Sequence, residues 1–365
     1  MRASALRCAV MTAVALNASP GSAQDAAPSD NVVMLPCDGH CPSITLPARL
    51  SGTAAEFPDR FAWGDYVEAF VDFEYTIGAD GHISDVHIKR LLGPQQFADV
   101  ARRSLENWVY KPATLNGEPV AVSHELHYYF SVPNAPVGGR PATARAYENA
   151  VSLIKDDKIV EALAVLRAAS AQPKLNFYER GMLASLTAPA LEAQGDTVGA
   201  RDLSRLALSY GRNVLPPAVL RNLYHVEIRS SLALGDIVDA AKSLGRLAHT
   251  RGFDAADPVI GQVRDMKTKI DAAPSYGAAG RIPAADEADG YSFWLYRRYF
   301  SFADVVGKLE RVTINCQERQ VESPIKAQID WHIPQEWSDC SIFVRGTPGT
   351  TFKIVQIKPD KAVAP

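Results

Sequence analysis

The sequence lacks any apolar run long enough to cross a bilayer and any surplus of basic residues. Its most apolar stretch, Cys8–Leu16, falls well short of the roughly 20 residues that a membrane-spanning helix needs. Lysine and arginine number 38 against 41 aspartates and glutamates, and no basic stripe stands out. A stable membrane span in the mature chain and nucleic-acid binding are therefore not expected. With 47% hydrophobic residues, the 365-residue chain predicts two or three domains with sizeable cores.

The sequence also lacks the short motifs of common catalytic sites. It contains no Gly-x-Ser-x-Gly elbow, phosphate loop, dinucleotide fingerprint or His-Glu-x-x-His motif. His124-Glu-Leu-His127 is one residue short of the last of these, and on a strand its two histidines point to opposite faces. We expect a non-enzymatic protein with no catalytic residue, metal or cofactor, although residues far apart in sequence can converge in a fold.

The first 23 residues have the three parts of a secretory signal. Arg2 and Arg7 flank the start of the apolar run, and the segment ends in the small residues Gly21-Ser22-Ala23. Cleavage after Ala23 would release a free periplasmic protein. The alternative is a retained signal that anchors the chain in the inner membrane, facing the periplasm. Residues 24–45 are rich in alanine, proline, serine and aspartate, which indicates an exposed tail or linker.

Cysteine is scarce, and removal of the signal leaves only Cys37, Cys41, Cys316 and Cys340. An even number in an oxidising compartment predicts two disulfides. Cys37 and Cys41 lie on either side of a glycine and can close a tight local loop, whereas haem attachment or zinc binding would need another spacing or further ligands. Cys316 and Cys340 favour a structural bridge, because the alternative, a catalytic redox pair, usually has Cys-x-x-Cys spacing.

A strand-strand-helix-strand pattern follows the tail. Residues 66–77 alternate between apolar and polar, which predicts a half-buried strand whose one exception is Phe70. Asp80-Gly81 suits a tight hairpin turn, so Ile83–Leu91 should return antiparallel to the first strand. A helical period then predicts a helix over the apolar face of the hairpin. Ser123–Val132 alternates again and predicts the closing strand.

Several signatures in this pattern resemble, in the same order, those of the C-terminal domain of TonB, the periplasmic energy-transducing protein family. They are Phe57-Pro58 at the start, Val71–Ile77 with Asp80-Gly81 in the hairpin, Trp108–Ala113 at the helix end and Asn116–Val120 in a turn. The resemblance covers residues 46–133. Each signature also has a purely structural explanation as a helix stop, a turn or a core residue, so these residues are expected to build the scaffold.

In the TonB family, this fold binds an extended peptide of an outer-membrane receptor at a sheet edge and passes on force from an inner-membrane motor. The resemblance implies that Ser123–Val132 is the candidate edge, with Glu125, His127 and Tyr129 on the side outside the core. The alternative is an edge strand that charged residues merely protect.

The departures from the family decide between two functions. Family transducers keep an uncleaved membrane helix and a long proline-rich spacer, whereas this chain has an apparently cleavable signal and a brief linker. We expect a periplasmic adaptor that binds a protein or peptide partner in the cell envelope, with an outer-membrane receptor as a candidate. The alternative is a TonB-type energy transducer for outer-membrane transport.

Residues 143–272 are rich in alanine and leucine at helical spacing and contain an internal repeat. Gly195-Asp196 and Gly235-Asp236 both open the pattern Gly-Asp-x-x-x-Ala at a spacing of 40 residues, and residues 157–162 match it less well. Each copy separates two helical stretches, as in solenoids built from helix pairs. The segment resembles three tetratricopeptide-like repeats that lack the usual tryptophan and tyrosine.

Residues 291–359 shift toward aromatic and β-branched residues. Short strands are expected within this segment, at residues 312–314, 327–331, 341–344 and 351–357. Cys316 and Cys340 should tie this small β-rich domain together, and its aromatic run favours a domain core over an exposed patch. The expected fold class is α+β multidomain: a TonB-like domain, a helical repeat and a small β-rich domain.

Overall fold

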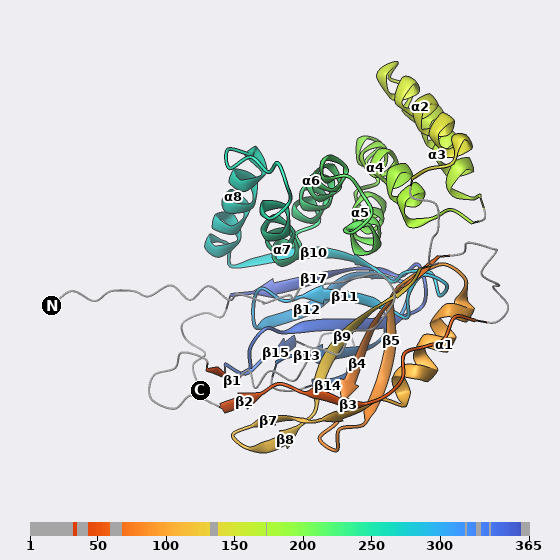
Figure 1. The fold of residues 1–365 in the computed structure, drawn as a ribbon. Helices are drawn as coiled ribbons and strands as arrows, with labels where there is room; N and C mark the ends of the chain where they lie inside the picture. The colour runs from red at the N-terminus through yellow and green to blue at the C-terminus, as the bar shows by residue number, and fades with distance from the viewer. Residues whose placement is uncertain are drawn as a thin grey trace.

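A computed structural model describes residues 32–34, 43–58, 68–131, 138–172, 174–317, 320–325, 330–335 and 337–358. The chain folds into a sheet domain on its N-terminal side, an array of helices and a C-terminal β domain, and the three parts meet (Figure 1). It therefore mixes helices and sheets, as an α+β protein should. The predicted signal peptide and the pair Cys37 and Cys41 lie outside the described residues.

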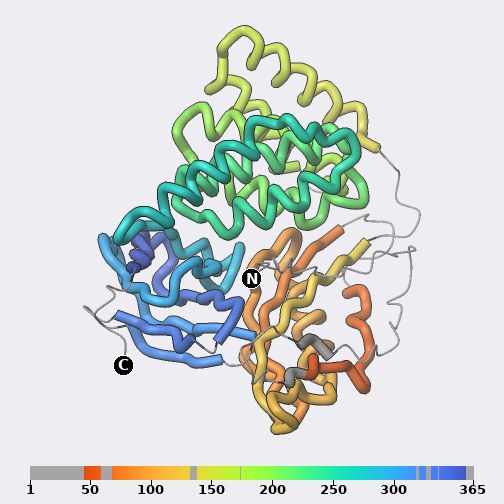
Figure 2. The backbone as a smooth tube through the Cα atoms, turned by 90° about the vertical axis from the view of Figure 1, so that its left-hand side faces the viewer, coloured from red at the N-terminus to blue at the C-terminus, as the bar shows by residue number. Residues whose placement is uncertain are grey.

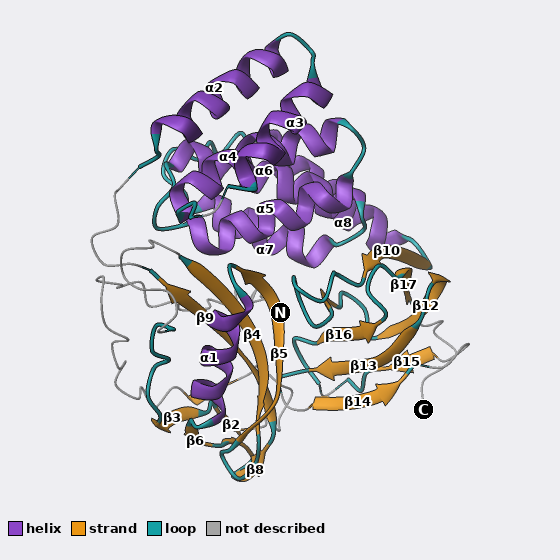
Figure 3. Ribbon diagram, turned by 90° about the vertical axis from the view of Figure 1, so that its right-hand side faces the viewer, coloured by secondary structure: helices purple, strands orange, loops and turns teal. Residues whose placement is uncertain are grey.

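The N-terminal domain is built on an antiparallel sheet with the strand order β5-β4-β9. Its strands are β4 (Ala69–Ile77), β5 (Ile83–Leu92) and β9 (Val122–Phe130). Helix α1 (Gln95–Glu106) lies across one face of this sheet (Figure 3), where it buries Phe97, Ala98, Ala101 and Leu105. The predicted strand-strand-helix-strand unit is confirmed.

A glycine closes the hairpin between β4 and β5. Gly81 N–H donates to Gly78 O at 2.9 Å, and the φ of Gly81 is +81°, which residues with a side chain rarely adopt. A Cβ at this position would lie 2.0 Å from Tyr110 O. The predicted Asp-Gly turn is present, with the positive φ on Gly81 and not on Asp80.

Two smaller antiparallel sheets extend the N-terminal domain. One has the order β1-β2-β7-β8, with strands β1 (Val32–Met34), β2 (Ser43–Thr45), β7 (Ala113–Leu115) and β8 (Glu118–Val120). The other pairs β3 (Ala48–Ser51) with β6 (Val109–Lys111). Because β2 pairs with β7, part of the segment interpreted as a tail belongs to this domain.

Strand β4 differs from its prediction, because both of its faces are buried. All nine of its residues are buried, including Asp72 at 0% and Glu74 at 3% exposure. The prediction of a half-buried strand is wrong, since the helices and the C-terminal domain cover the polar face. Phe70, the apolar exception on that face, joins the core of the helical array.

Helices α2 to α8 form an array that lies over both β domains (Figure 2). In chain order they are α2 (Pro141–Lys155), α3 (Ile159–Ser170), α4 (Phe177–Ala193), α5 (Thr197–Gly211), α6 (Pro217–Ala233), α7 (Ile237–Ala248) and α8 (Pro258–Ala272). Each helix packs against the next along the chain. Packing of each helix against its neighbours in the chain is the arrangement expected of stacked helix pairs.

The repeated Gly-Asp motif caps the second helix of a pair. Asp196 accepts a hydrogen bond from Gly199 N–H at 2.9 Å at the start of α5, and Asp236 accepts one from Asp239 N–H at 3.2 Å at the start of α7. The alanines of the motif are all fully buried: Ala162, Ala200 and Ala240. Their small side chains let the paired helices approach closely.

The C-terminal domain has two four-stranded antiparallel sheets around one core. Their orders are β10-β17-β12-β15 and β11-β16-β13-β14, with strands β10 (Ser275–Arg281), β11 (Tyr291–Trp294), β12 (Tyr299–Val306), β13 (Leu309–Asn315), β14 (Gln320–Pro324), β15 (Asp330–His332), β16 (Ser341–Gly346) and β17 (Thr351–Ile357). Both sheets contribute to the core, as Phe300 and Val312 illustrate. The domain starts before residue 291, because all of β10 pairs with β17.

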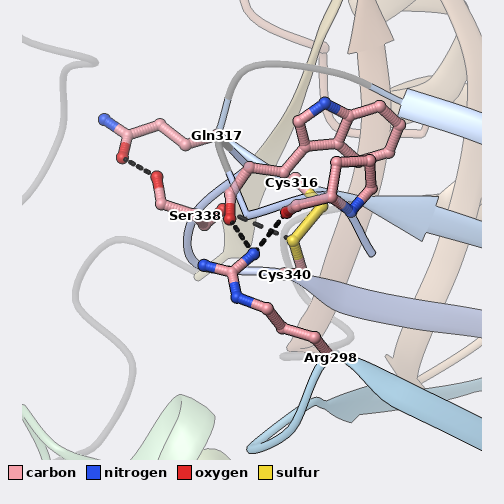
Figure 4. The surroundings of a disulfide bond; sticks show 7 residues. Arg298, Cys316, Gln317, Ser338 and Cys340 are labelled. Atoms are coloured by element: carbon pink, nitrogen blue, oxygen red, sulfur yellow. Dashed lines mark hydrogen bonds between the residues drawn. A yellow bond between two sulfur atoms is a disulfide. The ribbon is translucent and has the colours of Figure 1, made fainter. Parts of the chain in front are cut away.

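The predicted disulfide between Cys316 and Cys340 is present, with the two Cα atoms 4.1 Å apart (Figure 4). It joins the end of β13 to the start of β16. Beside it, the Arg298 guanidinium donates to Trp337 O at 2.7 Å, and the Ser338 hydroxyl donates to Gln317 Oε1 at 3.2 Å.

Within the described residues, no helix has the length and hydrophobicity to cross a membrane.

Candidate functional site

The outer edge of β5 is closed by the C-terminal domain. Leu91 N–H donates to Glu287 O at 2.9 Å, and Asp289 N–H donates to Ile88 O at 2.8 Å. The Asp289 carboxylate also accepts a hydrogen bond from Ile88 N–H at 2.7 Å. Residues 287–289 therefore take the place that an added strand would need along the Ile88–Leu91 part of β5.

The outer edge of β9 has no such cover. β9 pairs with β4 through all nine of its residues, from Phe130 opposite Ala69 to Val122 opposite Ile77. Among the described residues, no further strand pairs with it and no loop bonds to its backbone. β9 thus carries a row of backbone donors and acceptors of the kind that an extended peptide can pair with.

The three residues predicted to flank a bound peptide lie on the face of β9 opposite α1. Each has a partner there. Glu125 Oε1 is 2.5 Å from Lys89 Nζ, His127 Nδ1 is 2.9 Å from Asp72 Oδ1, and the Tyr129 hydroxyl donates to Ser209 O in α5 at 2.9 Å. They are outside the α1 core, as predicted, and they remain exposed, although Tyr129 also bonds to the helical array.

An ion-pair network connects the three strands beneath this face. Asp72 in β4 accepts hydrogen bonds from Arg90 in β5 through Nε, at 2.8 Å, and through Nη2. Burial raises the pKa of Asp72, but Arg90 and His127 more than offset this and hold the pKa well below its usual value. The pKa of the neighbouring Glu74 is raised instead, because burial raises it more than Lys89 lowers it.

Asp72, Glu125 and His127 also place possible metal-binding atoms within 4.8 Å of one another. Arg90 and Lys89 already neutralise the two carboxylates, however. A divalent cation would have to displace both positive side chains, so we interpret the group as part of the ion-pair network.

The network continues into the helices and the C-terminal domain. Arg90 Nη1 donates to Arg205 O in α5 at 3.4 Å. The Glu74 carboxylate accepts a hydrogen bond from Asn315 in β13, and Thr76 bonds to Gln320 in β14. The polar face of β4 is therefore the point at which the three parts of the molecule are joined.

A cleft of about 430 Å³ lies at this junction. β5 and β9 contribute Lys89, Arg90, Glu125 and His127, the helices contribute Arg205 and Lys242 among others, and the C-terminal domain contributes Trp294 and residues near 281–292. Arg205 pairs with Glu227 at 3.2 Å, Asp236 at 2.9 Å and Asp239 at 2.7 Å.

Sequence reasoning missed the cleft, because its residues come from three segments. One signal was available. Asp72 and Glu74 alternate with apolar residues just as exposed acids do, but Phe70 stands among them on the same face. An aromatic residue in a polar row indicates that something covers that row, and here the core of the helical array does so.

Residues 67–132 match the family model described as Gram-negative bacterial TonB protein C-terminal. Among solved structures, the chain is similar to the TonB C-terminal domain of Pseudomonas aeruginosa, determined by solution NMR, with 22% identity and a TM-score of 0.22; the similarity covers 25% of this chain and 90% of that chain. No curated protein matches the chain. The helical array and the C-terminal domain lie outside the family match, which covers the β5-β4-β9 sheet and helix α1 of the N-terminal domain.

Proposed function

We propose that the protein is a non-enzymatic adaptor of the periplasm that binds an extended segment of an envelope partner by strand addition at β9. The observation that carries the proposal is the contrast between the two edges of one sheet. Residues 287–289 bond to the backbone of β5, whereas no described segment bonds to the outer edge of β9. In strand addition, backbone hydrogen bonds supply affinity and alternate side chains supply selectivity.

Tyr129 is the side chain best placed to contact the added strand. Its side chain is 46% exposed, although its hydroxyl is held by Ser209 O. Directly opposed side chains on neighbouring strands lie about 5 Å apart, so a residue paired with Tyr129 would contact its ring. Glu125 is already paired with Lys89, and we assign it a smaller part in selectivity.

The family match supports an envelope partner. TonB C-terminal domains typically interact with outer-membrane receptors, and proteins with this domain act in the envelope of Gram-negative bacteria. An outer-membrane receptor with an extended segment is accordingly our candidate partner. The helical array would add a second surface for the same partner or for another one.

Two neighbouring proline substitutions test the proposal. The N–H groups of adjacent residues in a strand point to opposite edges, so one of His127→Pro and Tyr128→Pro removes a bond to β4 and the other removes an outward donor. The variant that unfolds at lower urea concentration identifies the inward position. The other variant keeps the backbone bonds to β4, loses some stability with its side chain, and should lose the envelope proteins that the wild type captures while it retains the native circular dichroism spectrum. Unchanged capture by a folded, outward-facing proline variant would refute strand addition at β9.

The N-terminus decides between a free adaptor and an anchored energy transducer. We propose the free form, because the signal has small residues at a cleavage site after Ala23. N-terminal sequencing of the exported protein should give a start at Gln24. A start at Met1 in the membrane fraction would favour the transducer.

A further inference from the structure

In the junction cleft, the charged side chains of the floor are paired with opposite charges, whereas several of those at the rim are not. On the floor, Lys89 is within reach of Glu125 and Glu74, Arg90 is bound to Asp72, and Arg205 is bound to acids of α6 and α7. These cations need no further counter-ion. The floor therefore explains how the domains are joined, but it gives no reason for a ligand.

The rim carries cations that the protein leaves without an acidic partner. Arg212, Arg246 and Arg281 line the cleft and are exposed, and within the described part of the chain none of them forms an ion pair. Of the acids of the rim, Asp202 is paired with Arg201 Nε at 2.9 Å, whereas Glu287 accepts only a backbone hydrogen bond, from Ala284 N–H. Three arginines without an ion pair therefore face one such acid among the described residues. The free charge at the mouth of the cleft is thus positive.

Lys242 strengthens this positive site from inside the cleft. It lies four residues before Arg246 on α7, so the two cations share one helix face and repel each other. Its Nζ lies over the Trp294 ring, 2.8 Å from the ring centroid, and it forms no ion pair with a described residue. Burial lowers the pKa of Lys242 to about 8, although Asp239 and Glu125 act in the opposite direction.

Arg212 and Arg246 line the same cleft although they come from different helices. Both act electrostatically on the Tyr224 hydroxyl in α6, where their positive charges oppose the rise of its pKa that burial causes. Arg246 also acts on Lys242. Three cations from α7 and the C-terminal end of α5 therefore line the cleft together with Trp294, whose ring lies against Lys242.

We propose that the junction cleft binds a small organic anion, a carboxylate or a phosphate ester, with its charged group at Lys242, Arg246 and Arg212 and its uncharged part against Trp294. The volume of about 430 Å³ is in the range of small-molecule sites, and an anion would relieve the repulsion between Lys242 and Arg246. The cleft adjoins β9, because Glu125 and His127 line it, but its proposed ligand binds the rim cations and not the backbone of β9. Neither proposal depends on the other. Because all three parts of the molecule line the cleft, a bound anion would tie them together.

Isothermal titration calorimetry on the full exported protein tests the proposal, with phenyl phosphate and phenylacetate as the two probes. Binding of either one supports the site, and the tighter of the two identifies the preferred anion. Lys242→Gln with Arg246→Gln should weaken binding by about ten-fold or more, because each removes a charge-assisted contact. Arg264→Gln on α8 removes an exposed arginine away from the cleft and should leave the dissociation constant unchanged.

A second readout separates a specific site from general charge attraction. A bound anion should raise the pKa of Lys242, whose charged neighbours are Asp239 and Arg246 on its own helix, Glu125 on β9 and Asp339 in the C-terminal domain. Binding near pH 8 should then take up protons, seen as a dependence of the heat on the buffer, and Lys242→Gln should abolish the uptake. Absence of binding by both probes at about 10 mM, or equal affinity in Arg246→Gln alone, would overturn the proposal.

Discussion

The two edges of the β5-β4-β9 sheet differ although their strands are of similar length and pair with the same central strand. The protein covers the Ile88–Leu91 part of the outer edge of β5 with residues 287–289 and leaves the outer edge of β9 without a described backbone partner. Unpaired edges invite association with other chains, so a protein gains by closing those it does not use. The difference indicates that the C-terminal domain blocks strand addition along part of β5 and leaves β9 as the longer free edge among the described residues.

The ion-pair network at Asp72 connects β4 to both edge strands, β5 and β9. Its disruption should reduce the free energy of unfolding more than any other change considered below. Asp72→Asn leaves Arg90 without its counter-ion beneath the helices, which should lower the free energy of unfolding by about 3 to 5 kcal/mol. Urea unfolding followed by circular dichroism measures the loss. Glu106→Gln, which removes an exposed acid from α1, should change stability by less than about 0.5 kcal/mol.

The same substitution should change the response to acid. The pKa of Asp72 in the folded protein lies below the value of about 3.9 in an unfolded chain, so its contribution is present above that pH and is lost as the pH falls further. Wild type and Asp72→Asn should therefore converge in stability toward low pH. A difference that stays constant down to pH 2 would contradict the assignment.

Removal of the disulfide should weaken the domain that closes β5. Cys316→Ser with Cys340→Ser frees a loop of 24 residues, which should cost about 3 kcal/mol in the C-terminal domain. Calorimetry should show a lower unfolding temperature for part of the molecule. Reduction of the wild type by a thiol should reproduce the shift, and an unchanged thermogram in the double variant would show that the bridge does not stabilise the closed edge.

A smaller change should expose the outer edge of β5 near Ile88 without unfolding the C-terminal domain. Asp289→Ala removes the carboxylate that accepts from Ile88 N–H, at a cost of about 1 kcal/mol. Hydrogen exchange at the amide of Ile88 should become faster, while Asp286→Ala, an exposed acid in the same loop, should leave it unchanged. Equal exchange in both variants would mean that Asp289 does not protect this edge.

The features that could be predicted from the sequence alone are those set by residues close together in the chain. The alternation of β4, the turn at Gly81 and the helix breaks at the two Gly-Asp motifs all follow from a few adjacent side chains. The disulfide was predictable because the expectation of export, together with an even number of cysteines after residue 23, limited the choices. The family signatures of the first domain were also local and appeared in order.

The remaining features depend on contacts between distant segments. β10 has the sequence Ser-Tyr-Gly-Ala-Ala-Gly-Arg, which is poor in strand-forming residues, and only its pairing with β17 makes it a strand. Asp236 shows the same limit. Its motif matches that of Asp196, yet Asp196 is exposed, whereas Asp236 is buried and bound to Arg205. No local pattern distinguishes the two aspartates.

Site-specific photo-crosslinking in intact cells tests the central claim most directly. A photoreactive phenylalanine derivative replaces Tyr129 on β9 in one strain and Ser84, an exposed residue of β5, in the other. We predict that residue 129 captures an extended segment of an envelope protein and that residue 84 does not. Capture of the same partner at both positions, or only at residue 84, would contradict the claim that β9 is the binding edge.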